Sequence, residues 1–417
     1  MIPELLSPAG NFEKMKAAIR FGADAVYLAG NIFGMRAAAD NFSDDELVSA
    51  VEYAHARGKR VYVTVNTMPH EGEYPALARY AEVLKTAKPD ALIVADIGVL
   101  SLLRERLPDM PLHISTQANA VSSAACLAWH RLGASRIVLA RELTLSEIRA
   151  IRAALPAEVE LETFIHGSMC ISYSGRCLLS SYLSGRDANR GGCTQPCRWS
   201  YRIENEKFAL VEEKREKTPL PIEEINGETF ILSSKDLSMI SHVPDLLEAG
   251  ISSFKIEGRM KSAYYTAVVT NAYRMAIDRA LRGDGTVDPA WLRELESVSH
   301  REYATGFFYD DPRESANVSS TTGYIGEKSY LATVLSYDAE RGEAFLVQRN
   351  KTTLGQCAEL LTPGQVGRPL TVTGLRAESG EAIGSTPHPM MRYYMSVPFE
   401  VHEGDILRMP VSVPDGE

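Results

Sequence analysis

The chain has 417 residues and a formal net charge of −10 at pH 7, with 45% hydrophobic and 24% charged residues. This length favours more than one domain, and the composition is that of a globular protein. The negative charge excludes a protein that coats nucleic acid non-specifically. We find neither the basic start and apolar run of a secretory signal nor an apolar stretch of membrane-spanning length. We therefore expect a cytoplasmic protein that makes no membrane contact, with reduced cysteines.

Apolar runs alternate with helical patterns through the first part of the chain. Seven runs are rich in Val, Ile and Leu, as strands buried on both faces should be, and they begin every 21 to 35 residues. The predicted strands are 4–7, 25–29, 60–66, 91–95, 112–116, 136–140 and 160–165. Between them, Ser43 to Glu46 and Thr144 to Glu147 match capping boxes at helix starts. The spacing predicts repeated βα units.

An eighth strand is predicted at 253–258, which completes the set that a (β/α)₈ barrel of the TIM type needs. An open doubly wound sheet is the alternative. The barrel is favoured because no glycine-rich dinucleotide fingerprint follows the first strand and the repeat continues without a break. This domain would span 1–290, interrupted by an insertion at about 167–250 that carries most of the cysteines. Insertions of this length in a compact fold are usually functional.

The residue pattern of the sequence changes after a predicted helix at 261–283. Short alternating segments with Gly, Pro and Asp turns begin near residue 323, and the DAERGE segment at 338–343 matches a hairpin turn. We expect a small antiparallel β-barrel or sandwich domain at 323–417. Residues 291–322 would then be a linker and packing segment.

Four of the six cysteines lie within 28 residues: Cys170, Cys177, Cys193 and Cys197. They are separated by six, fifteen and three residues, so only one pair is close. Zinc ribbons mostly repeat a short two-cysteine knuckle, and small residues surround these thiols, which favours an iron–sulfur cluster over Zn²⁺. Structural thiols are a third reading. A nucleophilic pair of Cys170 with His166 would require Cys170 to be unligated. The isolated Cys126 and Cys357 are expected to be small buried side chains.

Polar residues follow the predicted strands, where the active site of such a barrel lies. They are Asn66, Asp96, Gln117, Arg141, Glu142, His166, Lys255, Glu257 and Arg259. Asp96 and Glu142 could instead be helix caps, and Asn66 and Gln117 could make loop hydrogen bonds. Strand alternation places Lys255 and Glu257 on one face, where burial requires a partner or a ligand. A structural ion pair between those two is the alternative to a functional role.

The cysteine segment has a net positive charge, whereas the chain as a whole has a net negative charge. From His166 to Arg202 it has five arginines and one acidic residue, Asp187. Solvated surface charge is the simpler explanation of these arginines.

Several separated motifs resemble one known family. ETFIHGSMC at 162–170 and GRCLLS at 175–180 are similar to the signature of the collagenase-like peptidase family of unassigned type, U-thirty-two. ELLSPAGN at 4–11, STQAN at 115–119, FKIEGRMKS at 254–262 and HREYATGFF at 300–308 agree with it. The resemblance covers nearly the whole chain. It is strongest to the bacterial tRNA hydroxylation proteins of that family.

That resemblance implies an iron–sulfur-dependent tRNA-modifying enzyme. The implied reaction converts the wobble uridine to 5-hydroxyuridine without molecular oxygen, with prephenate as hydroxyl donor. A 4Fe-4S cluster would be held by Cys170, Cys177, Cys193 and Cys197, with zinc as the alternative occupant. The implied partners are tRNA, prephenate and a partner protein of the same family.

The resemblance also assigns roles to residues. Prephenate carries two carboxylates, so we expect it to contact cationic and amide side chains. The predicted substrate-binding residues are Arg36, Asn66, Gln117, Arg141, Lys255 and Arg259. The predicted proton-transfer residues are His166, Glu257 and Lys255. The predicted RNA-binding residues are Arg186, Arg190, Arg198, Trp199 and Arg202.

Two other functions stay open at this stage. The family name carries a peptidase (hydrolase) activity, although the chain has neither a GxSxG elbow nor the second His of a zinc-protease helix at 70–74. The second alternative is an accessory protein of oxygen-independent quinone hydroxylation. Those relatives generally lack the C-terminal β domain, which is predicted in this chain.

Overall fold

The computed structural model describes residues 2–35, 40–170, 172, 174–177, 180, 184–198, 234–309 and 330–410. For 189, 198, 209–210, 220–221, 223–225 and 228–230 it describes the backbone alone. The chain divides into two compact units. The first comprises Met1–Ile19, Ala23–Lys261 and His300–Ile325, and the second comprises Arg20–Gly22, Ser262–Ser299 and Gly326–Glu417.

Eight parallel strands of the first unit close into a barrel. β1 to β7 follow one another in chain order, and β13 pairs with both β1 and β7, which closes the ring. Their bounds are β1 Glu4–Pro8, β2 Ala25–Leu28, β3 Arg60–Val65, β4 Ala91–Val94, β5 Leu112–Ile114, β6 Ala134–Val138, β7 Glu160–Ser168 and β13 Ser253–Ile256. These strands are buried almost throughout, as strands covered on both faces must be. The predicted TIM-type barrel is confirmed.

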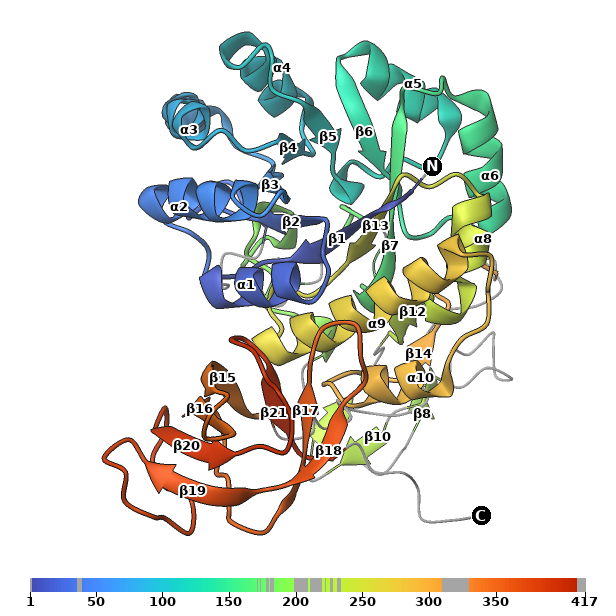
Figure 1. Ribbon diagram of the computed structural model, residues 1–417. Helices are drawn as coiled ribbons and strands as arrows, with labels where there is room; N and C mark the ends of the chain where they lie inside the picture. Colours follow the sequence, from blue (N-terminus) through green and yellow to red (C-terminus); the bar gives the residue numbers. More distant parts are fainter. Residues whose placement is uncertain are drawn as a thin grey trace. The chain divides into compact units, whose positions relative to one another are not determined.

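Helices lie outside the strands (Figure 1) and begin where the capping signals predict. They are α1 Phe12–Arg20, α2 Asp44–His55, α3 Tyr74–Ala87, α4 Ile97–Arg106, α5 Ser123–Arg131, α6 Leu145–Ala154 and α8 Val243–Glu248. Short 3₁₀ turns are η1 Glu71–Glu73, η2 Thr116–Ala118, η3 Ala188–Arg190, η4 Pro196–Arg198 and η5 Ile240–His242. Ser43 and Thr144 both form complete capping boxes. Within the described residues, no helix is both long and apolar enough to cross a membrane.

The insertion after the seventh barrel strand extends the sheet beyond the ring. β12 (Asp236–Ser238) pairs antiparallel with the end of β7, and β14 (Tyr303–Ala304) pairs with β12. Two small backbone hairpins join β8 Ala209–Leu210 to β9 Leu220–Pro221 and β10 Glu223–Ile225 to β11 Glu228–Phe230. This pairing explains why β7 runs to Ser168, three residues past the predicted end, because a partner strand satisfies its outer edge there.

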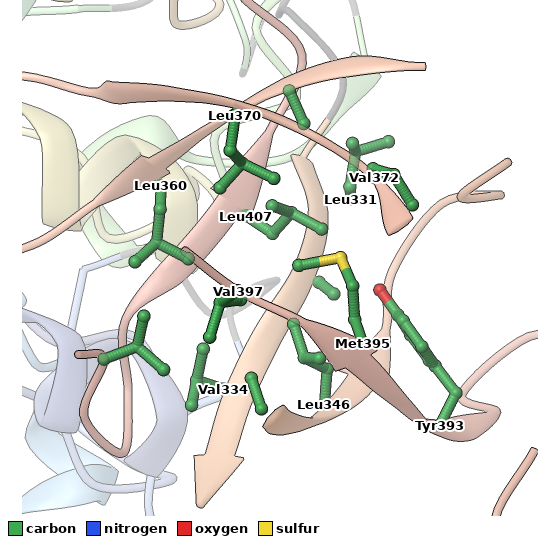
Figure 2. Close-up of a cluster of buried hydrophobic side chains, with 14 of the residues drawn as sticks. Leu331, Val334, Leu346, Leu360, Leu370, Val372, Tyr393, Met395, Val397 and Leu407 are labelled. Carbon is green, nitrogen blue, oxygen red and sulfur yellow. The ribbon is translucent and has the colours of Figure 1, made fainter. Parts of the chain in front are cut away.

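The second unit combines two helices with a seven-stranded antiparallel sheet. The helices are α9 Ala263–Leu281 and α10 Pro289–Glu296. The strands, in sheet order, are β18 Arg368–Thr371, β17 Cys357–Leu361, β21 Ile406–Arg408, β15 Tyr330–Asp338, β16 Glu343–Gln348, β20 Arg392–Ser396 and β19 Thr373–Ala377. Figure 2 shows Leu346, Leu360, Met395 and Leu407 converging in its apolar core. The hairpin turn predicted at 338–343 joins β15 to β16.

The ranges expected from the sequence assign α9 to the barrel domain, whereas the structure groups α9 and α10 with the C-terminal sheet. Polar contacts of both helices explain this grouping. On α9, Asn271 donates to the carbonyl oxygen of Gln365 at 2.8 Å and accepts from the backbone N–H of Gly364 at 2.7 Å. On α10, Glu294 pairs with Arg408 of β21.

Arg408 is the centre of a buried ion-pair network in the second unit. Its guanidinium is fully buried and lies 2.6 Å from both carboxylate oxygens of Glu294 and 2.9 Å from Glu359. The hydroxyl of Tyr264 is a further contact at 3.1 Å. One cation therefore joins β21, β17, α10 and α9.

Candidate active site

A pocket opens at the carboxyl ends of the barrel strands. Its lining combines apolar and aromatic side chains with polar and charged ones. The lining residues are Tyr27, Met35, Thr64, Asn66, Ile93, Ser115, Thr116, Gln117, Val138, Arg141, Phe164, Lys255, Glu257 and Arg259. The structure thus brings together six of the residues that we predicted at strand ends: Asn66, Gln117, Arg141, Lys255, Glu257 and Arg259. Arg36 lies outside the described residues.

Lys255 is one of the cations that line this pocket, and its partner lies on the neighbouring strand. Its Nζ donates to Oε1 of Glu162 at 2.7 Å and lies 4.5 Å from the ring centroid of Tyr27. Lys255 therefore forms a buried ion pair, but its partner is Glu162 and not Glu257, which follows the last residue of β13. Burial acts to raise the pKa of Glu162, but the charges of Lys255 and Arg136 outweigh it and lower that pKa to about 2.

A column of buried charges continues below Lys255 through the barrel. Arg136 donates to Glu162 at 3.1 Å and to Glu4 at 2.6 Å, and Tyr62 donates to Glu4 at 2.6 Å. Glu4, Arg136, Glu162 and Lys255 are each at most 4% exposed. Two carboxylates therefore balance two cations, which is what burial of such groups requires.

The polar side chains of the pocket lining differ in charge. Asn66 donates to the Ser115 hydroxyl at 3.3 Å and accepts from the backbone N–H of Met35 at 3.1 Å. Arg141 donates to the carbonyl oxygen of Ser168 at 3.0 Å and packs 5.3 Å from the ring of Phe164. The lining thus offers uncharged hydrogen-bonding groups together with three cations, Arg141, Lys255 and Arg259, and one carboxylate, Glu257. This arrangement suits a small organic anion.

His166 is not among the residues that line the pocket. Its Nε2 lies 3.5 Å from the hydroxyl of Tyr303, and the ring of Tyr303 packs edge-on against His300. Burial lowers the pKa of His166 to about 3, against the opposing charge of Asp236, and burial lowers the pKa of His300 to about 4. Both imidazoles are therefore neutral at pH 7.

The first part of the cysteine segment is docked on the barrel rim. The backbone N–H of Ser174 donates to Glu142 at 2.8 Å, and Arg190 pairs with Glu73 at 2.7 Å. Gly175, at φ +70°, packs directly on the carbonyl of Gln117. Glu142 is thus an anchor for this segment, while Thr144 caps the following helix. Asp96, by contrast, is the N-cap of α4, which confirms the helix cap given above as the alternative to a role in the active site.

The four thiols of this segment are of the donor type that binds iron–sulfur clusters and zinc. None of the six cysteines is in a disulfide. Cys170 is exposed, and Cys177, Cys193 and Cys197 are half-buried. Across the residues that the structure describes, no three His, Cys, Asp or Glu side chains form a metal-holding group. Outside the segment, Cys126 is buried as predicted, but Cys357 is exposed at the start of β17, so that prediction was wrong.

Comparison with protein-family models matches residues 10–317 to peptidase family U32 and residues 327–408 to the peptidase family U32 C-terminal domain. The chain belongs to peptidase family U32. The family resemblance seen in the sequence motifs is therefore confirmed. The two matches together span both compact units.

Three relatives of this chain are named for the RNA that they hydroxylate. It is 35% identical to the tRNA hydroxylation protein P1 of Bacillus subtilis over 97% of this chain and 94% of that protein. It is 36% identical to the tRNA hydroxylation protein P of Escherichia coli over 95% and 94%. It is 36% identical to a 23S rRNA 5-hydroxycytidine synthase of Escherichia coli over 78% of this chain and 48% of that protein.

Exposed apolar side chains lie in the loops at the pocket end of this family member's barrel. Ile32 follows β2, Ile97 begins α4, Val121 precedes α5, and Met260 follows β13. Their exposed fractions are 45%, 59%, 41% and 44%. Each of these four side chains therefore presents apolar surface to solvent at this end of the barrel.

The predicted RNA-binding residues are only partly described. Arg186 is exposed, whereas Arg190 is held by Glu73. The side chain of Arg198 and all of Trp199 and Arg202 lie outside the described residues. Sequence reasoning assigned no role to Glu162, although a carboxylate inside a buried apolar strand was an available signal for it.

Proposed function

We propose that this protein is an RNA hydroxylase that acts on tRNA. The main support is that the chain is 35% and 36% identical to two proteins named for tRNA hydroxylation, over almost their full length. The third relative, named as an rRNA 5-hydroxycytidine synthase, supports the same class of reaction on RNA. The specific reaction that we propose is conversion of the wobble uridine to 5-hydroxyuridine without molecular oxygen.

Prephenate is the proposed hydroxyl donor. Its two carboxylates would contact the cations of the lining, Arg141, Lys255 and Arg259. Its ring would pack on the aromatic side chains of the lining, Tyr27 and Phe164. Asn66 and Gln117 would bind its remaining oxygens, and Arg36 remains a predicted contact.

Proton transfer next to the donor is assigned to Glu257, which lines the same pocket. His166 does not line the pocket and is neutral at pH 7. Its proposed part in proton transfer is therefore that of a neutral imidazole that accepts or donates a hydrogen bond.

The RNA would approach over the rim, where Arg176 and Arg186 are exposed. A loop uridine splayed out of its stack would enter the pocket mouth. The apolar side chains of Ile97 and Val121 would contact that unstacked base.

An iron–sulfur cluster, held by Cys170, Cys177, Cys193 and Cys197, is the proposed cofactor, with zinc as the alternative. Such a cluster would supply electron transfer or substrate polarisation beside the pocket. Ser174 and Gly175 of the docked segment would fix the position of its ligands on the rim. Iron, sulfide and zinc analysis of anaerobically purified protein distinguishes the two occupants.

The test of the function is nucleoside mass spectrometry of tRNA from cells that lack the gene and every paralogue. We expect 5-hydroxyuridine to disappear and to return with the wild-type gene. Undiminished 5-hydroxyuridine would overturn the proposal.

Two further measurements test the alternative functions. Gelatin cleavage by the purified protein that is lost in Cys170→Ser would favour the peptidase. A fall in cellular quinone with normal tRNA would favour the accessory role in quinone hydroxylation. Full activity of the purified chain would show that a partner protein of the same family is dispensable.

The proposed contact between Val121 and the RNA can be tested by substitution. We expect Val121→Ser to weaken binding of an anticodon stem-loop RNA by about fivefold to tenfold, because base contacts with apolar or aromatic side chains contribute about 1–3 kcal/mol. Leu132→Ser is the matched control, since Leu132 is 44% exposed at the opposite end of α5. Fluorescence anisotropy at fixed salt measures both. Equal affinities for the two variants would remove Val121 from the interface.

A further inference from the structure

Glu162 and Lys255 form a pair in which only one member lines the pocket. Lys255 lines it, whereas Glu162 has no exposed surface and is not among the lining residues. Their charged atoms are 2.7 Å apart. Any effect of Glu162 on a bound ligand must therefore pass through Lys255.

The surroundings of this pair restrict where the ammonium group lies. The ring centroids of Tyr27 and Phe164 are 4.5 Å and 5.5 Å from Lys255 Nζ. The other carboxylate oxygen of Glu162 accepts from Arg136 at 3.1 Å. Glu162 and the two rings thus hold the ammonium group, and because Lys255 also lines the pocket, a ligand bound there can accept a hydrogen bond from it.

A lysine at this place could serve in two chemically different ways. As a neutral amine it could attack a ketone and form a Schiff base; as an ammonium ion it could bind a carboxylate. A carboxylate oxygen 2.7 Å from Nζ is the partner that an ammonium ion takes in a charge-assisted hydrogen bond. The ring contacts also favour a cation.

We infer that Glu162 is a positioning residue that holds Lys255 as a fixed ammonium ion for binding a carboxylate of the small-molecule substrate, and that Lys255 is not an amine nucleophile. This inference rests on the proposed function, which places a dicarboxylate keto acid in the pocket. It assigns Lys255 to substrate binding, one of the roles predicted for it from the sequence, and it gives Glu162 a role.

The test is a double-mutant cycle on the full chain, with prephenate as the titrated ligand in calorimetry. We expect Lys255→Met and Glu162→Gln each to weaken binding by about tenfold or more, as loss of one partner of a buried charge pair does. The double variant should bind no more weakly than Lys255→Met, because Glu162 acts only through Lys255. Additive losses, or wild-type affinity in Glu162→Gln, overturn the inference.

Glu4→Gln is the matched control. Glu4 is an equally buried carboxylate on the same column and contacts Arg136, but not Lys255. It should lower the melting temperature about as much as Glu162→Gln and leave prephenate affinity within about twofold. If Glu162→Gln does not fold, Glu162→Asp keeps the charge but withdraws it from Lys255, and an unchanged affinity in that variant counts against the inference.

Borohydride reduction in the presence of prephenate separates the two forms of Lys255. An unchanged mass of the Lys255 peptide supports the fixed ammonium ion, and a ligand adduct there overturns it. Absence of any prephenate binding by the wild-type chain overturns this inference together with the proposed donor. The proposal of RNA hydroxylation is judged separately by the nucleoside measurement.

Discussion

We expect Gly175→Ala to lower tRNA hydroxylation about 10- to 100-fold, since displacement of catalytic groups by about 1 Å has effects of this size. Gly175 has a φ of +70°, and a Cβ added there would lie 2.0 Å from the carbonyl oxygen of Gln117. The obstacle is backbone that follows β5 directly, so it cannot rotate away as a side chain could. The cysteine segment would therefore leave the rim.

Gly185→Ala separates this displacement from backbone strain. Gly185 lies in the same segment with a φ of +67°, but a Cβ there would meet no atom within 4 Å. It carries the same left-handed strain without the clash. Nucleoside mass spectrometry of tRNA from cells that express each variant measures activity, and limited proteolysis reports whether the segment has undocked. Equal losses in both variants would attribute the effect to strain alone.

The second large effect concerns the C-terminal unit. We expect Arg408→Met to lower the free energy of unfolding by about 3–5 kcal/mol, because it leaves the buried carboxylate of Glu294 and the partly buried carboxylate of Glu359 without a cation. Urea denaturation followed by circular dichroism measures the change. Arg341→Met is the control, since that side chain is 69% exposed in the β15–β16 hairpin and should change stability little.

A triple variant tests the cause of that loss. Arg408→Met combined with Glu294→Gln and Glu359→Gln removes the uncompensated charges along with the cation. It should recover part of the lost stability, since the main penalty is burial of charges without a partner. If the triple variant is no more stable than Arg408→Met, shape and packing of the guanidinium are responsible instead.

The barrel could be predicted from the sequence because its strands are buried on both faces. Such strands read as continuous apolar runs, and capping residues such as Ser43 and Thr144 separate them from helices. The short strands β12 and β14 have no such signature, since they only extend the sheet beside β7. Their pairing depends on a register that distant segments set together.

The candidate site was predictable in position but not in pairing. Strand ends identify the pocket because all parallel strands of a barrel end at one side. The partner of Lys255 could not be read from alternation within its own strand, since Glu162 comes from a strand more than 90 residues earlier. The packing of Tyr303 between His166 and His300 likewise depends on the added strand β14.

The closure of the ring by β13 has a consequence for biosynthesis. Until residues 253–256 have left the ribosome, β1 and β7 lack the neighbour that each of them meets in the finished protein. Both are buried strands in the finished protein, and an unpaired strand edge of this kind recruits other chains. A nascent polypeptide halted before that point should consequently depend on chaperones and should aggregate when they are scarce.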